Sequence, residues 1–168
     1  MDTVEFKGKT YPKLITEGQH SQYIIPTAKK FCTGLIGYDI GCNKKEWAFP
    51  GAIPIDITLD NNNYDAFNLP TKPVDYIFSS HCLEHLNNYV DALEYWTFRI
   101  KKGGTLFLYL PHENCEYWKP WIMPTKKHLH QFYPEQIKEI LSNLGYINIF
   151  STGCDLAFSF AVVGEKAW

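Results

Sequence analysis

Arginine is nearly absent from the sequence. Arg99 is the single arginine beside fifteen lysines, and the formal net charge is −2. Proteins that bind duplex nucleic acid normally need a basic face with arginine contacts to phosphates and bases, and there is no long basic run here. The composition therefore argues against nucleic acid as the main partner.

Long apolar runs are also missing. The longest apolar stretch, near residues 157–164, is much shorter than a membrane-spanning helix. The first residues, MDTVEFKGK, carry an acid at the second position and no apolar segment, which is not the pattern of a secretory signal. The five cysteines are odd in number and scattered, which suits reduced thiols. We therefore expect a cytoplasmic protein that does not enter a membrane.

The composition is that of a packed globule. Hydrophobic residues make up 45% of the 168 residues and aromatic residues 16%, which is enough for a sizeable core. No repeat or low-complexity segment divides the chain. We predict one domain over residues 1–168, with an N-terminal arm at 1–20 and a lid-like loop at 112–133.

Strand and helix patterns alternate along the chain, which is typical of an α/β fold. Residues 3–15 suggest a hairpin or an extended arm. The last two strands are predicted to be antiparallel because few residues join them. The expected strands are 35–40, 52–57, 74–80, 105–110, 146–151 and 156–164, and the expected helices are 21–32, 83–100 and 134–144.

The segment from residue 34 to residue 56 is the first candidate for a ligand site. It contains a buried strand, a turn that begins at Gly41, and a second strand that ends in Asp56. In open α/β sheets, ligands bind beyond the carboxyl ends of strands, where turn amides and a strand-end acid hold polar groups such as ribose hydroxyls. The alternative is that Asp56 only caps the following turn. We predict a nucleotide-like ligand at this turn.

Several stretches, in order, resemble the class I S-adenosylmethionine-dependent methyltransferases, in particular the small single-domain type 11 group. The stretches are YDIGC at 38–42, AIPIDI at 52–57, DAFNLP at 65–70 with VDYIFSSHCLEHL at 74–86, RIKKGGTLFLYLPH at 99–112 and KHLHQFYPEQIKEILSNLGY at 127–146. The resemblance implies a Rossmann-like, mostly parallel sheet of six to seven strands with a C-terminal antiparallel strand. Short connections after Gly41 and Asp56 predict a reduced third strand.

The resemblance also implies S-adenosyl-L-methionine as the cofactor. It places Asp56 on the ribose, Asp65 on the adenine amino group, and Ser80 with His81 near the sulfonium. Carboxylates suit ribose hydroxyls and amino groups, because charged acceptors form the stronger hydrogen bonds. The residues implied to bind the cofactor are Asp39, Gly41, Cys42, Asn43, Asp56, Ile57, Asp65, Ala66, Ser80 and His81.

Two residues depart from the family pattern. The family usually has glycine where this sequence has Asn43 and Lys45. Asparagine tolerates positive φ, whereas Lys45 requires another path or an outward side chain. A rival reading is therefore a non-catalytic binding protein on the same fold, with or without the cofactor. A nicotinamide oxidoreductase is disfavoured because the full glycine fingerprint is missing.

Histidines are the predicted catalytic residues. His81 and His112 each follow a predicted strand, and a neutral imidazole can accept a proton from an attacking hydroxyl or amine. Each histidine can instead hold a loop in place. The expected reaction is methyl transfer to an oxygen or nitrogen of a small molecule, such as a sugar or another metabolite, and alignment of the acceptor can supply much of the rate.

Further histidines follow in an extended stretch. His128 and His130 alternate, so they are expected to point to one side, and with Tyr133 they are predicted to position the substrate. A zinc site that adds His112 and Cys115 matches no standard spacing, so no metal is predicted.

Two further expectations concern the start of the helix predicted at 83–100 and the oligomeric state. Glu84 and His85 are read as a charge at the helix start and a packed imidazole. A sheet edge left bare by a missing strand would invite pairing of two copies as a homodimer.

Overall fold

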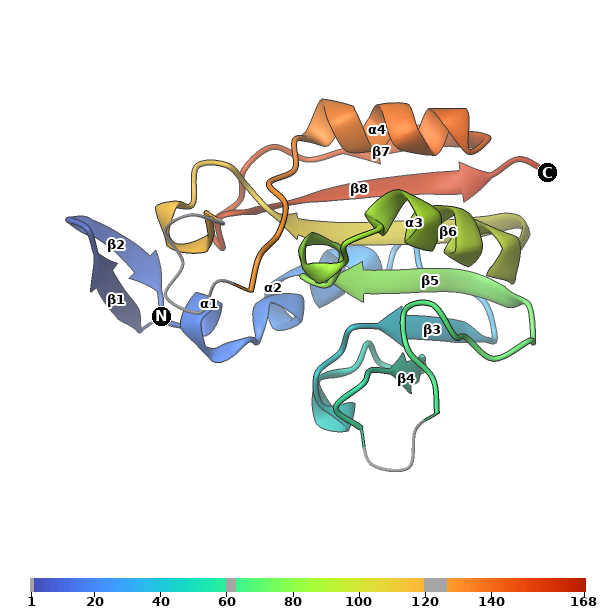
Figure 1. Ribbon diagram of the computed structural model, residues 1–168, viewed down its shortest axis with the longest axis horizontal. Coiled ribbons are helices and arrows are strands. Elements are labelled where there is room, and N and C mark those ends of the chain that lie inside the picture. The colour runs from blue at the N-terminus through green and yellow to red at the C-terminus, as the bar shows by residue number, and fades with distance from the viewer. Residues whose placement is uncertain (1, 60–62, 120–126) are drawn as a thin grey trace.

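A single mixed sheet forms the centre of the molecule in the computed structural model, which describes residues 2–59, 63–119 and 127–168. Its strand order is β4-β3-β5-β6-β8-β7. The first four strands are parallel to one another, and β8 runs antiparallel to both β6 and β7 (Figure 1). The strands are β3 (Gly37–Ile40), β4 (Ile53–Ile55), β5 (Val74–Ser80), β6 (Ile100–Pro111), β7 (Tyr146–Ser151) and β8 (Ser159–Lys166).

Helices cover both faces of the sheet (Figure 1). Helix α2 (His20–Ala28) packs on one face against aromatic side chains of β5 and β6. Helices α3 (Tyr89–Arg99) and α4 (Pro134–Asn143) pack on the other face, where Trp96 is fully buried. The remaining helices are one turn long: α1 (Leu14–Glu17) and the 3-10 turns η1 (Lys45–Trp47), η2 (Leu83–His85) and η3 (Glu116–Trp118).

The N-terminal arm is a hairpin of β1 (Thr3–Phe6) and β2 (Lys9–Pro12). Lys7 and Gly8 both have positive φ, as a tight two-residue hairpin turn requires. The hairpin lies apart from the main sheet (Figure 1). Tyr11 on β2 is fully buried in a small core with Trp118 of η3. The arm therefore packs on the segment that follows β6.

The predicted fold class is confirmed. The main sheet has six strands, and the antiparallel β7 and β8 end the chain. In the described residues between β4 and β5, an isolated bridge joins Asp65 and Asn68 and no strand of the main sheet forms, which confirms the reduced third strand. None of the helices in the described ranges is long and apolar enough to cross a membrane.

The helix predicted at 83–100 was wrong at both ends. Residues 83–85 form η2, and α3 begins only at Tyr89. Residues 100–104 belong to β6, although the lysines and glycines at 101–104 are typical of a helix end. Ile100 pairs with Val74 across a bulge, and Lys101 forms an ion pair with Asp75 at 2.5 Å. Strand pairing therefore overrides the helix-ending pattern of the lysines and glycines.

Candidate functional site

A cavity of about 680 Å³ lies at the carboxyl ends of β3, β4 and β5. In Figure 1 the arrowheads of β3 and β5 point to the side of the molecule where α1 and the hairpin lie. This volume suits a small organic ligand. The structure brings most of the predicted site residues to its wall, namely Asp39, Gly41, Cys42, Asn43, Asp56, Ile57, Ala66, Ser80, His81 and His128.

The turn after β3 depends on Gly41. Its φ is +87°, and a Cβ at this position would lie 2.4 Å from Cys82 Cβ. Only glycine therefore lets the end of β3 lie so close to Cys82, which is in the connection between β5 and η2. Asn43 has φ +61°, as expected for an asparagine that replaces a family glycine. Lys45 is exposed and is not among the described residues that line the cavity.

Asp56 joins the loops that follow β3 and β4. One carboxylate oxygen accepts the N–H of Asn43 at 2.7 Å, and the other accepts the N–H of Thr58 at 2.9 Å. The capping role considered for Asp56 is therefore present together with its place on the cavity wall. A ligand hydroxyl would meet a carboxylate whose orientation is already set.

Asp39 is a buried acid on the cavity wall. Its Oδ2 accepts the N–H of Phe49 at 2.6 Å, and Oδ1 has no hydrogen-bond partner among the described residues. Burial raises the pKa of the Asp39 carboxyl to about 7, the Phe49 N–H opposes this rise, and Asp56 adds to it. A carboxylate in this state favours a cationic group in the cavity.

His81 is packed among other rings. It follows β5 with φ +51°, and its ring stacks on His20 with a centroid distance of 3.9 Å. Trp118 packs edge-on at 4.6 Å, and Nε2 lies 2.9 Å from the Ser159 hydroxyl. Burial holds the pKa values of His81 and His20 well below the usual range, so both rings are neutral near pH 7.

Glu84 is a site residue that the sequence reasoning missed. It is fully buried, and its Oε1 lies near one nitrogen of each of three imidazoles. The distances are 3.4 Å to His81 Nδ1, 3.7 Å to His128 Nε2 and 4.0 Å to His85 Nε2. Glu84 and His85 lie in η2 and not in the first turn of a long helix, which corrects the role expected for them. The H-x-x-E-H spacing of residues 81–85 was the available signal.

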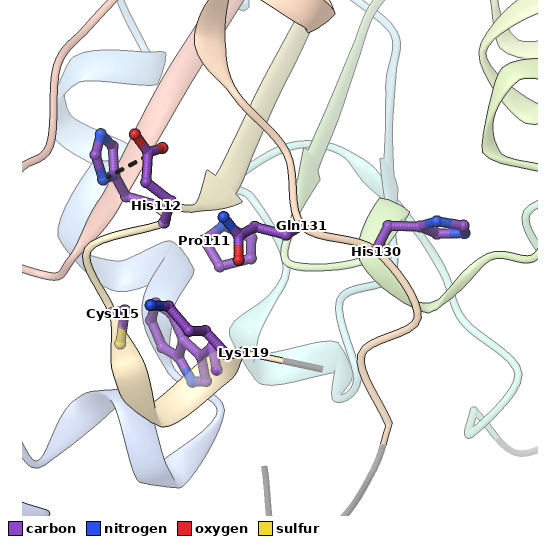
Figure 2. A pocket seen from close by; sticks show the side chains of 8 residues that line it. Pro111, His112, Cys115, Lys119, His130 and Gln131 are labelled. Carbon is purple, nitrogen blue, oxygen red and sulfur yellow. Dashed lines mark ion pairs between the residues drawn. The ribbon is translucent and has the colours of Figure 1, made fainter. Parts of the chain in front are cut away.

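Four predicted site residues lie away from this cavity. His112 and His130 line a separate small hollow beside Pro111 and Gln131 (Figure 2). His112 is 3.7 Å from the Glu113 carboxylate, the dashed pair in Figure 2. Tyr133 is 48% exposed, and Asp65 accepts the N–H of Phe67 at 2.7 Å in its own turn.

His128 and His130 do not point to one side as expected. His128 is 5% exposed and lines the large cavity, whereas His130 Nε2 lies 2.9 Å from the Leu86 carbonyl. Figure 2 shows the His130 ring turned away from His112. The stretch does not alternate as a regular strand does, because the N–H groups of two consecutive residues, Leu129 and His130, both donate to the Glu84 carbonyl. The lid-like loop at 112–133 lies partly outside the described residues, which include η3 but not 120–126.

Solved structures share this fold at low sequence identity. A methyltransferase described as S-adenosylmethionine-dependent, from Archaeoglobus fulgidus, has a TM-score of 0.64 and 18% identity over 87% of this chain and 92% of that one. Human N-acetylserotonin methyltransferase has a TM-score of 0.64 and 15% identity, and the match covers 93% of this chain and 55% of that one. Magnesium protoporphyrin IX methyltransferase from Synechocystis has a TM-score of 0.60 and 14% identity, and the match covers 91% of this chain and 81% of that one.

Sequence comparison assigns the family. A search of curated proteins found no match. A family model described as a methyltransferase domain matches residues 18–149, which run from the residue after α1 into β7 and include the whole turn after β3 and the 81–85 segment. Since this match spans most of the chain and the fold agrees with solved methyltransferases, the chain belongs to the methyltransferase domain family.

Proposed function

We propose that this chain binds S-adenosyl-L-methionine in the 680 Å³ cavity and transfers its methyl group to an oxygen or nitrogen atom of a small molecule. The observation that carries the proposal is the placement of Asp39 and Asp56 at the tips of β3 and β4 on one cavity wall. Human N-acetylserotonin methyltransferase and magnesium protoporphyrin IX methyltransferase from Synechocystis were both solved with S-adenosylmethionine bound, which supports the same use of the fold here.

The residues present fit this cofactor. Asp39 offers a buried carboxylate oxygen without a described partner to a cationic amino group. The turn at Gly41 brings backbone close to the ligand, and Asp56 offers acceptors to ribose hydroxyls. When bound, the sulfonium supplies a methyl group on a good leaving group. The chain then has to align the acceptor and exclude water.

The predicted catalytic histidines have unequal support. His81 lines the cavity with a neutral, closely packed ring, and it remains the predicted proton acceptor. His112 lies at the separate hollow, so a catalytic role for it would require the acceptor to extend beyond the described cavity. Substrate contact by His128 fits its place on the wall better than contact by His130 or Tyr133.

Calorimetry with S-adenosylmethionine and S-adenosylhomocysteine tests the proposal. Replacing Asp56 with alanine should weaken binding by roughly 1–3 kcal/mol, because charged hydrogen bonds to the ribose and to the Asn43 loop are lost. Asp91→Ala, which removes an exposed acid in the first turn of α3, serves as the matched control and should leave affinity unchanged. Absence of heat for both ligands with the wild-type chain would instead support a non-catalytic protein on the same fold.

A further inference from the structure

We propose that Glu84, His85 and His128 form a binding site for a divalent transition-metal ion such as Zn²⁺ on the wall of the cavity. Among the described residues, this is the one group of three or more candidate ligands whose atoms lie close enough together, all within 4.8 Å of one another. Two imidazoles and one carboxylate are a donor set that Zn²⁺ accepts, with other positions left open. Metal binding here does not depend on the proposed methyl transfer.

The distances suit tetrahedral coordination. Bonds of about 2.0–2.2 Å to nitrogen and oxygen place ligand atoms of a tetrahedron roughly 3.4 Å apart. Glu84 Oε1 lies 3.7 Å from His128 Nε2 and 4.0 Å from His85 Nε2. The two histidine ligand atoms lie within 4.8 Å of each other. Side-chain shifts of up to about 1.4 Å would therefore complete the site.

The hydrogen bonds of the two rings leave the correct nitrogen atoms free. His85 Nδ1 lies 2.8 Å from the Lys127 carbonyl, and His128 Nδ1 lies 3.0 Å from the Trp118 carbonyl. A carbonyl only accepts, so each Nδ1 carries the proton and each Nε2 presents a lone pair toward Glu84. Metal-binding histidines are typically held in this way, with the other ring nitrogen donating to a backbone carbonyl.

A third imidazole nitrogen faces the same carboxylate, because His81 Nδ1 lies 3.4 Å from Glu84. The Ser159 hydroxyl lies 2.9 Å from His81 Nε2 and 3.2 Å from the Ala157 carbonyl. In the tautomer in which this hydroxyl donates to Ala157, Nε2 carries the ring proton and Nδ1 presents a lone pair to Glu84. Neither carboxylate oxygen of Glu84 has a hydrogen-bond partner within the described part of the chain, although the residue is fully buried. Burying the carboxylate oxygens beside imidazole lone pairs without a hydrogen-bond donor is unfavourable. A divalent cation bound between these atoms would remove the electrostatic repulsion.

The open side of the site faces the ligand cavity, since His81, His85 and His128 all line it. An oxygen of a bound molecule can therefore complete the coordination. If the proposed function holds, this oxygen is the methyl acceptor, and the ion would promote loss of its proton. This second role rests on the proposed function, whereas the metal site itself does not.

Metal binding is measured on the full chain after removal of any affinity tag and bound metal. Zn²⁺ is titrated against a chromophoric chelator, and Co²⁺ is followed by its visible absorption. The wild-type chain should bind one ion, and Glu84→Gln and His128→Gln should weaken binding at least about tenfold. His130→Gln removes an imidazole from the same stretch but outside the cluster, so it should bind as the wild type does.

Thermal unfolding separates a lost ligand from a lost fold. Zn²⁺ should raise the unfolding temperature of the wild-type chain and of His130→Gln, because an ion that binds only the folded state stabilises it. Metal-free Glu84→Gln should be folded, since its amide can donate to the imidazole lone pairs, but Zn²⁺ should not stabilise it.

Wild-type binding no tighter than that of the Glu84 and His128 variants would overturn the site. Calorimetry with S-adenosylmethionine on the same samples measures cofactor binding independently of the metal titration. A failure of the metal site can therefore be distinguished from a failure of the proposed function.

Discussion

At the scale of single residues, Asp39 and Asp56 have different environments although they lie on one cavity wall. The Asp56 carboxylate accepts backbone N–H groups on both oxygens, so its charge is well supported. Asp39 is almost fully buried, has one described hydrogen bond, and has its pKa raised to about 7 by burial. Asp39 is therefore the residue whose charge state should respond to a cationic ligand.

Binding of S-adenosylmethionine should release a proton near pH 6. In the free protein Asp39 is mostly protonated below its pKa of about 7, and a cation beside it lowers that pKa. The release should decline as the pH rises above 7, because Asp39 is then already ionised. Calorimetry in buffers with different heats of ionisation measures this proton. Asp39→Asn should abolish the release, and a wild-type chain that releases no proton near pH 6 would contradict the assignment.

At the scale of elements, two glycine turns bound the segment between β3 and β4. Gly41 and Gly51 have nearly the same backbone angle, φ +87° and φ +88°. A Cβ on Gly41 would meet Cys82 at 2.4 Å, whereas a Cβ on Gly51 would meet nothing within 4 Å. Substitutions at the two glycines therefore separate the energetic cost of backbone strain from the cost of a steric contact.

Gly51→Ala should cost roughly 1–2 kcal/mol of unfolding free energy, the usual penalty for an L-residue with positive φ. Gly41→Ala should cost about 1–3 kcal/mol more, because the methyl group also overpacks against Cys82. Urea denaturation of the two variants gives the comparison. Equal losses would show that the contact between the β3 turn and Cys82 is easily relaxed.

At the scale of the whole molecule, the N-terminal hairpin and the segment after β6 share a small core of their own. Tyr11 packs against Phe158 at a centroid distance of 4.8 Å, and Phe6 packs against Tyr117 at 5.1 Å. Trp118 of the same core also contacts His20 and His81, so this core reaches the cavity wall. The arm therefore supports one side of the site from outside the sheet.

Tyr11→Ala should destabilise the small core between the arm and the segment after β6 without destabilising the sheet. Removal of a large buried ring typically costs about 3–5 kcal/mol, and here the loss should appear as local opening. Hydrogen exchange should rise at residues 112–119 and in α1, while β3 and β5 keep their protection. Tyr133→Ala, at an exposed position, should change neither region. Faster exchange throughout the sheet would show that the arm and the sheet unfold as one unit.

Association of two copies is also a property of the whole molecule. The edge strand β4 has only three residues, whereas the opposite edge, β7, carries Ile147 and Phe150 about half exposed. A homodimer stays a prediction, which sedimentation can test, and β7 offers the longer edge for pairing.

Local features of the sequence determined the framework. The strand at 74–80, the helix that begins at Pro134 and the turn at Gly41 form where they were predicted. Apolar periodicity, the fixed φ of proline and the freedom of glycine act over a few residues, so the sequence alone reveals them. The order of these elements was enough for the fold class and for the position of the turn after β3.

Only the tertiary structure decided which side chains share a cavity. Strand pairing drew residues 100–104 into β6, and hydrogen bonds from Leu129 and His130 to the Glu84 carbonyl set the path on which His128 and His130 diverge. Glu84 became a buried centre for three imidazoles because η2 turns it inward against a distant part of the chain. Such proximity depends on long-range packing and on side-chain direction, which no local period encodes.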